Sequence, residues 1–303
     1  MPVRSLPLSI YRQLLYPAYL RLPDPVYRFV DTLVYRNDCN LGGPGYYREY
    51  LKWRWHISTN NSVGTLPHKL TVILLSFKRV RNIQLIVQGL LKLPFVETII
   101  VSNNNPEYRI EQWIHFKDPR VRLINQPKPT PPGIRFELAR GESGKYFLTI
   151  DDDVFLYSHQ LTTLAKALMD DSLSPCGIQG ENREFGTQNN GQRSEGWHSG
   201  ISGFDGRVDV INRVYAFTRE HLDEMYQLAA RLNIEVGALA NGEDLLLSFS
   251  GYSKPRLIKV GRILGCLSEN REGIATWTSR AGFFAERRGL YDKLLAAKCL
   301  AVR

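Results

Sequence analysis

Long hydrophobic runs are scarce in this sequence, and their scarcity argues against a membrane-spanning chain. The longest apolar stretches, such as Leu-Thr-Val-Ile-Leu-Leu at 70–75, fall far short of the roughly 18 residues that a spanning helix needs. At the N-terminus, Arg12 and Pro17 come before any clean hydrophobic stretch or small-residue cleavage site. We therefore expect neither a transmembrane helix nor a signal peptide.

Cysteine is also sparse. The chain has 4 cysteines, widely separated and without a Cys-x-x-Cys spacing: Cys39, Cys176, Cys266 and Cys299. This pattern argues against both a zinc site and a dense disulfide framework. With no signal peptide expected, it favours a cytoplasmic protein in a reducing compartment, with peripheral attachment to a membrane left open.

Charge of one sign is in excess only at the two ends. The net charge is +9, but residues 1–66 carry 8 Lys+Arg against 4 Asp+Glu and residues 251–303 carry 11 against 4, so the middle is slightly acidic. A basic protein that binds nucleic acid or a membrane surface is the non-enzymatic alternative. Because the excess is confined to the ends, we expect no nucleic-acid partner, whereas an anionic membrane surface or a homodimer contact stays open.

The composition and the secondary-structure pattern of the sequence change near residue 67. Residues 1–66 are aromatic and basic, and they read as a helical extension, an appendage with short helices at 11–22, 26–34 and 46–56. Strand and helix signals then alternate: strands at 70–76, 97–102, 121–124 and 146–150, and helices at 80–93, 219–232, 241–251 and 279–298. Residues 184–212, rich in Gly, Asn, Gln and Ser, read as a long loop. The alternation predicts an α/β fold with a parallel or mixed sheet flanked by helices.

Three adjacent acids, Asp151, Asp152 and Asp153, follow the strand predicted at 146–150. The carboxyl ends of such strands are where open α/β sheets bind ligands. Mutual repulsion of the acids calls for a cation, and their hard oxygen atoms suit Mg²⁺ or Mn²⁺ held together with a diphosphate. A turn with helix-capping aspartates is the plainer alternative for this motif taken alone.

Polar residues follow the other predicted strands too. Ser76 and Arg79 come after the first strand, and Asn103 and Asn104 after the second. An arginine can pair with a diphosphate, and asparagine amides can bind the edge of a pyrimidine or a ribose. Asparagine is equally common in ordinary turns. We count these four as candidate nucleotide-binding residues.

Five short motifs, in this order, resemble the exostosin-like glycosyltransferase domain. They are Leu-Ser-Phe-Lys-Arg at 75–79, Ile-Ile-Val-Ser-Asn-Asn at 99–104, Thr-Ile-Asp-Asp-Asp at 149–153, Asn-Gly-Glu-Asp-Leu-Leu-Leu-Ser-Phe at 241–249 and Trp-Thr-Ser-Arg-Ala at 277–281. The resemblance covers about residues 68–298. It implies a GT-A type, Rossmann-like fold over 67–303, with a nucleotide-binding half at about 67–155 and an acceptor half at about 156–303.

The resemblance also implies a function. A relative of this family would transfer a hexose or N-acetylhexosamine from a UDP-sugar to a glycan or lipid-linked acceptor, with retention of configuration and with Mn²⁺ or Mg²⁺. Asp151 and Asp153 match the metal and nucleotide carboxylates, Asp244 the catalytic-site acid and Arg280 the active-site arginine. Arg135 matches one member of an arginine-rich stretch before the triplet, and Asp152 joins the nucleotide set.

Two further enzyme classes stay open at this point. An inverting GT-A transferase would use Asp244 as a general base. A sugar-nucleotide nucleotidyltransferase also places acids on a Rossmann-like sheet, but it usually needs a glycine-rich phosphate loop near the first strand. Residues 76–81 contain no glycine, which disfavours this class.

Overall fold

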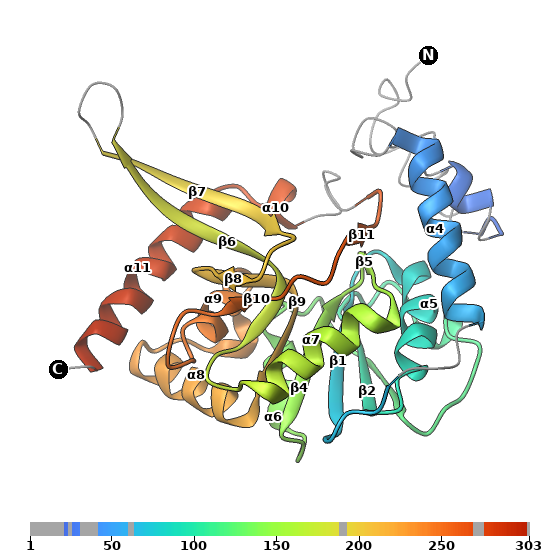
Figure 1. Ribbon diagram of the computed structural model, residues 1–303, viewed down its shortest axis with the longest axis horizontal. Coiled ribbons are helices and arrows are strands. Elements are labelled where there is room, and N and C mark those ends of the chain that lie inside the picture. Colours follow the sequence, from blue (N-terminus) through green and yellow to red (C-terminus); the bar gives the residue numbers. More distant parts are fainter. Residues whose placement is uncertain are drawn as a thin grey trace.

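A nine-stranded mixed sheet with helices on both faces forms the centre of the computed structural model (Figure 1). The structure describes residues 21–23, 26–30, 42–59, 64–187, 193–268 and 276–301. The strand order is β3-β2-β1-β4-β9-β6-β10-β8, with β7 paired to β6 outside this row. The predicted α/β class, a mixed sheet flanked by helices, is confirmed.

The strands are β1 (Leu70–Ser76), β2 (Val96–Asn103), β3 (Val121–Asn125), β4 (Tyr146–Asp151), β5 (Val154–Phe155), β6 (Cys176–Thr187), β7 (Arg193–Ser202), β8 (Gly206–Arg207), β9 (Val210–Thr218), β10 (Arg256–Leu257) and β11 (Leu264–Gly265). β5 and β11 form a separate two-stranded sheet. The helices are α4 (Gly42–Thr59), α5 (Val80–Leu91), α6 (Ile134–Arg140), α7 (Ser158–Asp170), α8 (Arg219–Arg231), α9 (Glu243–Ser248), α10 (Thr276–Ser279) and α11 (Phe283–Ala301), with 3₁₀ turns η3 (Ile110–Gln112) and η4 (Val236–Ala238).

Four parallel strands bring their carboxyl ends to one edge of the sheet. β1 lies between β2 and β4, and β3 continues the row beyond β2, all in parallel. The order β3-β2-β1-β4 is that of a Rossmann-like sheet. The register pairs Leu75 with Asp151 and Ser76 with Asn103, so the polar residues that end these strands are neighbours. Every residue of β1 is buried, as expected for a central parallel strand covered on both faces.

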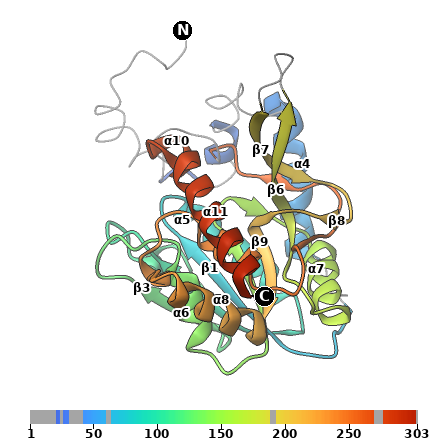
Figure 2. The ribbon, with the colours of Figure 1, turned by 90° about the vertical axis from the view of Figure 1, so that its left-hand side faces the viewer.

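Alternate residues of these strands supply two separate hydrophobic cores. Val72 and Leu74 point to the face covered by α4, α5 and α7. Ile73 and Leu75 point to the face covered by α6, α8, α9 and α11. Figure 2 shows α7 and α4 on the opposite side of the sheet from α6 and α8. The period of two along a buried strand thus divides the helices into two layers.

The predicted loop at 184–212 is wrong, because most of this segment is strand. β6 and β7 form a long antiparallel hairpin that projects from the sheet (Figure 1), and β8 and the start of β9 follow it. Glycines in β6 permit a close approach to β9: a Cβ on Gly180 would lie 2.5 Å from the carbonyl oxygen of Val210. Gly180 precedes the segment predicted as a loop, and it lets the strand that leads into the hairpin pack against β9.

α4 belongs to the core, which corrects the prediction that the N-terminal extension is an appendage. Trp53 is 1% exposed, and its indole nitrogen donates to the carbonyl oxygen of Leu156 at 2.9 Å. The Trp53 and Tyr50 rings lie 4.6 and 5.6 Å from the ring of Phe155. Of the helices predicted at 11–22 and 26–34, only residues 21–22 and 26–30 are described, and 26–30 are helical.

The outer face of α4 is different in character. Leu51 and Trp55, one turn apart, are exposed there beside the cations Arg48 and Lys52. Contact of this face with an anionic bilayer stays a prediction. No helix in the described part of the chain combines the length and apolar character needed to cross a membrane.

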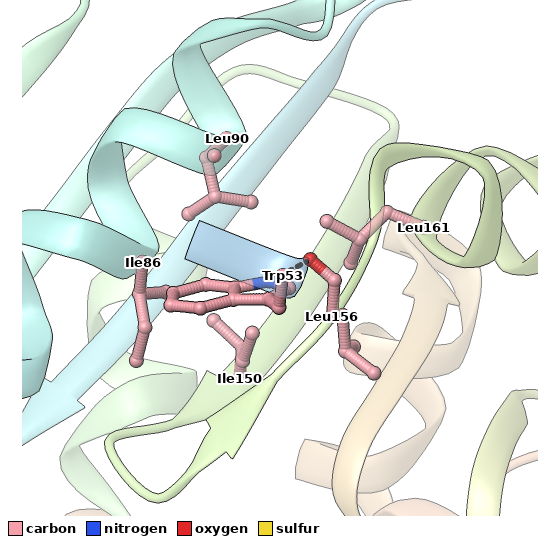
Figure 3. Close-up of a pocket in the computed structure, with 7 residues that line it drawn as sticks. Trp53, Ile86, Leu90, Ile150, Leu156 and Leu161 are labelled. Atoms are coloured by element: carbon pink, nitrogen blue, oxygen red, sulfur yellow. Dashed lines mark hydrogen bonds between the residues drawn. The ribbon is translucent and has the colours of Figure 1, made fainter. Parts of the chain in front are cut away.

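A small apolar cavity lies under α4, between α5, β4 and α7 (Figure 3). It measures about 10 Å³ and is lined by Trp53, Ile86, Gly89, Leu90, Ile150, Leu156 and Leu161. A cavity needs roughly 10–15 Å³ and several polar partners to hold one water, so this one is at the lower limit of size and lacks the polar lining. It is a packing defect of the core rather than a ligand site.

The two tryptophans of α4 test how firmly the helix belongs to the core. We expect Trp53→Ala to lower the free energy of unfolding by about 3–5 kcal/mol, because it removes a buried ring and its hydrogen bond. Trp55→Ala, on the exposed face of the same helix, should change it by less than about 0.5 kcal/mol. Urea unfolding of the full chain measures both. Equal, small effects would mean that α4 is an appendage after all.

Candidate active site

The acidic triplet lies at the carboxyl edge of the sheet, where β4 ends. Its side chains differ in exposure: 30% for Asp151, 8% for Asp152 and 14% for Asp153. Three buried or half-buried carboxylates in a row repel one another and lose hydration. Each of them is paired with an arginine, and the three arginines come from different elements of the fold.

Arg135 neutralises Asp151 from the start of α6. Its Nη2 donates to Asp151 Oδ1 at 2.9 Å, and its Nη1 donates to the hydroxyl of Tyr215 at 3.2 Å. Glu243 Oε1, at the start of α9, lies 3.8 Å from the same Nη2. Arg135 is 5% exposed, so this predicted residue is built into the site by contacts with β4, β9 and α9.

Arg79 and the turn around it hold Asp152. Arg79 Nη1 donates to Asp152 Oδ1 at 3.1 Å and lies 3.4 Å from Asp153 Oδ2. The backbone N–H of Phe77 donates to the other Asp152 oxygen at 3.0 Å. Arg79 is held in turn by the backbone carbonyl of Ser268, which accepts from Nη2 at 3.0 Å. The segments that follow β1, β4 and β11 thus meet at Asp152.

Arg213 is a site residue that the sequence did not identify as one. Its Nη2 donates to Asp153 Oδ1 at 3.1 Å and its Nη1 to Gln179 Oε1 at 3.2 Å. Its backbone has φ 61°, a left-handed conformation that is costly for a residue with a Cβ. The pairing of β6 with β9 shifts register at this point, so Arg213 lies in a bulge that turns its side chain toward the triplet.

Burial and the arginines act in opposite directions on the pKa values of the triplet. Burial raises the pKa of Asp151 and of Asp152, although Arg135 and Arg79 oppose the rise. At Asp153 burial also acts to raise the pKa, but Arg213 and Arg79 outweigh it and the pKa is lowered. Glu243 has a pKa raised to about 7, by burial and by the neighbouring Asp244. Burial therefore disfavours the ionised forms of Asp151, Asp152 and Glu243, whereas the arginines favour the ionised form of Asp153.

A second buried cluster lies beside the first, around Asp244. Arg287 in α11 forms a bidentate pair with Asp244, at 2.9 and 3.0 Å, and its Nη2 also donates to Glu181 Oε2 at 2.8 Å. All three side chains are less than 10% exposed. Asp244 lies in the first turn of α9, as predicted. The residue before the helix is Gly242, with φ 90°, so the helix begins at Glu243 rather than at residue 241 as predicted.

Arg280 lies outside these two clusters. It is exposed and pairs with Glu286 at 2.7 Å. Asn241 links this pair to the buried cluster, since it donates to Glu286 at 3.3 Å and accepts from Arg287 at 3.3 Å. The predicted helix at 279–298 is interrupted, because α10 ends at Ser279 and α11 begins at Phe283, directly after Gly282 with its φ of 75°. The arginine in contact with Asp244 is therefore Arg287 rather than Arg280.

The remaining predicted residues lie at the ends of β1 and β2. Asn103 uses both ends of its amide inside the protein: it donates to the carbonyl of Tyr108 at 2.6 Å and accepts from the N–H of Asn105 at 3.2 Å. Asn104 accepts from the hydroxyl of Ser102 at 2.7 Å. These contacts stabilise the turn after β2. Ser76 Oγ is buried and has no hydrogen-bond partner in the described part of the chain.

A signal for Arg287 exists in the sequence. Arg287, Tyr291 and Leu294 follow a helical spacing, and all three are buried on the face of α11 that covers the second core. An arginine within such an apolar stripe predicts a buried carboxylate partner. No comparable signal marks Arg213, because its role depends on a bulge.

No complete metal site is preformed. Among the residues that the structure describes, no group of three or more His, Cys, Asp or Glu side chains is arranged to hold a metal ion. Asp151 and Asp153 nonetheless offer the hard oxygen ligands that Mg²⁺ and Mn²⁺ prefer. Asp151, the most exposed carboxylate of the triplet, is open to a ligand. The residues fit a cation whose other ligands come from a bound diphosphate and water.

Comparison with known proteins gives limited overlap. No family model matches the sequence, and no curated protein matches it. Among solved structures, the chain is similar to the crystal structure of GalNAc-T7 with UDP, GalNAc and Mn²⁺. The identity is 11%, the TM-score is 0.44, and the match covers 64% of this chain and 42% of the other. This likeness identifies no family, and the exostosin-like resemblance stays a prediction.

The buried Arg287 and the exposed Arg280 should differ in their effect on stability. We expect Arg287→Met to lower the free energy of unfolding by about 3–5 kcal/mol, because it leaves Asp244 and Glu181 buried without their cation. Arg280→Met removes only a surface pair and should cost less than about 1 kcal/mol. Thermal and urea unfolding measure the difference. A small loss in Arg287→Met would show that the cluster is open to water.

Proposed function

We propose that the chain is a metal-dependent glycosyltransferase that moves a hexose or N-acetylhexosamine from a UDP-sugar to a glycan or lipid-linked acceptor. One observation carries the proposal: adjacent carboxylates, held by arginines, end a central parallel strand at the edge where β1 and β2 also end. Such an edge binds nucleotides in open α/β sheets, and its carboxylate oxygens suit a cation held together with a diphosphate.

Asp151 and Asp153 would hold the metal. A bound Mn²⁺ or Mg²⁺ would neutralise the diphosphate and stabilise it as a leaving group. Asp152 has a different task, because it is the least exposed of the three and both of its oxygens accept hydrogen bonds, from Arg79 and from the Phe77 N–H, whereas Asp153 accepts one, from Arg213. It fixes the turn after β1, so it keeps Arg79 beside the phosphate position. The triplet therefore combines two ligand carboxylates with one structural carboxylate.

Arg79 and Arg135 would bind the nucleotide together with the ends of β1 and β2. Both guanidinium groups lie beside the triplet, where a diphosphate bound to the metal would also lie. The buried hydroxyl of Ser76 supplies an unused hydrogen-bonding group at the same edge. Asn103 and Asn104 would act by shaping the turn after β2, since their amides are engaged within the protein.

Asp244 would stabilise positive charge on the transferred sugar. A bidentate arginine pair fixes the orientation of this carboxylate, which suits electrostatic stabilisation better than proton transfer. An inverting enzyme needs a general base on the far face of the sugar, whereas retention lets the departing phosphate accept the proton. We therefore favour retention, with Arg287 holding Asp244 and Arg280 available to a leaving phosphate.

The alternative classes have less support. A nucleotidyltransferase would need a phosphate loop after β1, but residues 76–81 lack glycine. A nucleic-acid-binding protein would place cations, rather than a row of acids, at the open edge of the sheet.

Metal and donor binding can be tested without an acceptor. We expect UDP to raise the melting temperature only when Mn²⁺ is present, because the carboxylates repel a diphosphate without a cation. Asp153→Asn should abolish this rise and UDP-sugar hydrolysis, while far-UV circular dichroism stays unchanged. Asp170→Asn, an exposed carboxylate paired with Lys166, is the matched control and should behave as the wild type. Full hydrolysis in EDTA would refute metal dependence.

The stereochemistry of the product tests the role of Asp244. We expect an α-linked product from an α-linked UDP-sugar, and a loss of turnover of about 10²-fold or more in Asp244→Asn. The anomeric proton coupling in the NMR spectrum of the product decides between the mechanisms. A β-linkage would make Asp244 a general base. The turnover of Arg280→Ala then shows whether this exposed arginine takes part.

A further inference from the structure

The N-terminal segment reaches the acidic triplet through a buried arginine. Arg28, in the helical turn at 26–30, is 1% exposed, although it lies well before the first strand of the sheet along the chain. Its guanidinium carbon lies 4.9, 5.0 and 5.5 Å from the ring centroids of Tyr27, Tyr50 and Phe155. Its Nη2 donates to Asn82 Oδ1 at 2.6 Å. The aromatic surroundings favour the cation and restrict its orientation.

Asn82 connects Arg28 to the triplet through a second hydrogen bond. It lies in the first turn of α5, is 1% exposed, and its Nδ2 donates to the carbonyl oxygen of Asp152 at 2.6 Å. The orientation of the amide follows from chemistry, because an arginine only donates and a carbonyl only accepts. The oxygen must therefore face Arg28 and the nitrogen must face Asp152. A single side chain thus joins the N-terminal segment to the backbone between the two ligand carboxylates.

A second arginine, Arg81, binds the N-terminal segment but makes no contact with the triplet. Arg81 Nη1 donates to the carbonyl of Leu22 at 2.6 Å, and its guanidinium lies 4.2 Å from the ring centroid of Tyr27. Arg81 and Asn82 are adjacent at the start of α5. Loss of either arginine should loosen the segment, but only Arg28 orients Asn82. The chain therefore provides its own control.

We propose that Arg28 and Asn82 are positioning residues for the donor site: through the Asp152 carbonyl they set the spacing of Asp151 and Asp153. This proposal rests on the proposed function and adds the N-terminal segment to the site. Carboxylates that bind a metal depend on the groups that orient them, and loss of such a group typically costs 10–100-fold in affinity. Phe155, on the strand that follows the triplet, packs against the same guanidinium. Arg28 thus contacts Phe155 directly and reaches Asp152, on the other side of Asp153, through Asn82.

The experiment compares Arg28→Met with Arg81→Met in the whole 303-residue chain. Methionine keeps much of the apolar stem of arginine and removes the donor. Calorimetry measures the dissociation constant of UDP in saturating Mn²⁺, and amide hydrogen exchange over residues 148–156 is followed without metal or nucleotide. We expect Arg28→Met to raise the dissociation constant about tenfold and to speed exchange at the triplet. Arg81→Met should leave both near wild type, although it loosens the segment.

Conservative variants separate positioning from simple destabilisation. Arg28→Lys can still donate to Asn82 and should recover much of the UDP affinity, whereas Asn82→Asp cannot donate to the Asp152 carbonyl and should resemble Arg28→Met. Equal effects of Arg28→Met and Arg81→Met, on binding and on exchange, would overturn the proposal. If the wild type fails to bind UDP with Mn²⁺, the proposed function fails. The exchange comparison then still decides whether Arg28 orders the triplet.

Discussion

Three carboxylates in a row at the end of a buried strand form the constraint on which the rest of this structure depends. Asp151, Asp152 and Asp153 lose hydration and repel one another, so the fold must bring cations to them. Arg79, Arg135 and Arg213 do so from the segment after β1, from α6 and from β9. These segments are far apart in the chain. Neutralising one short acidic motif therefore ties together much of the sheet and the helix on one of its faces.

The arginines are themselves held by partners outside the triplet. Arg135 donates to Tyr215, Arg213 to Gln179 and Arg79 to Ser268. Each guanidinium is fixed at more than one point, so little conformational freedom remains to be lost when a ligand binds. The strained backbone of Arg213 belongs to this arrangement, since an ordinary strand would direct the side chain elsewhere. Such preorganised charge is what a site for a diphosphate and a metal requires.

The N-terminal segment follows the same logic. Its buried aromatic residues, Tyr50 and Trp53, complete the core on one face of the sheet, and Arg28 adds a buried cation among them. The sequence pattern did not reveal this packing, because aromatic and basic residues also suit an exposed helix that faces a membrane. Both properties occur in α4, on opposite faces of one helix: Trp53 is buried and Trp55 is exposed. Because Trp53 and Trp55 are two residues apart, their side chains point about 200° apart around the helix axis.

The sequence by itself determined the central strands and the position of the triplet. Apolar runs at 70–76 and 146–150 are long enough to predict buried parallel strands, and acids directly after one of them must lie at the carboxyl edge.

Only the tertiary structure decided which cations meet those acids. Arg213 depends on a bulge between β6 and β9. Arg287, within α11, meets Asp244, whereas Arg280, before the start of α11, pairs with Glu286. The β6–β7 hairpin was not predicted either, because a segment rich in Gly, Asn, Gln and Ser resembles a loop, and only its pairing with another strand shows that it is a strand. Local patterns specify periodicity and strand ends, whereas pairing of side chains from distant segments depends on packing.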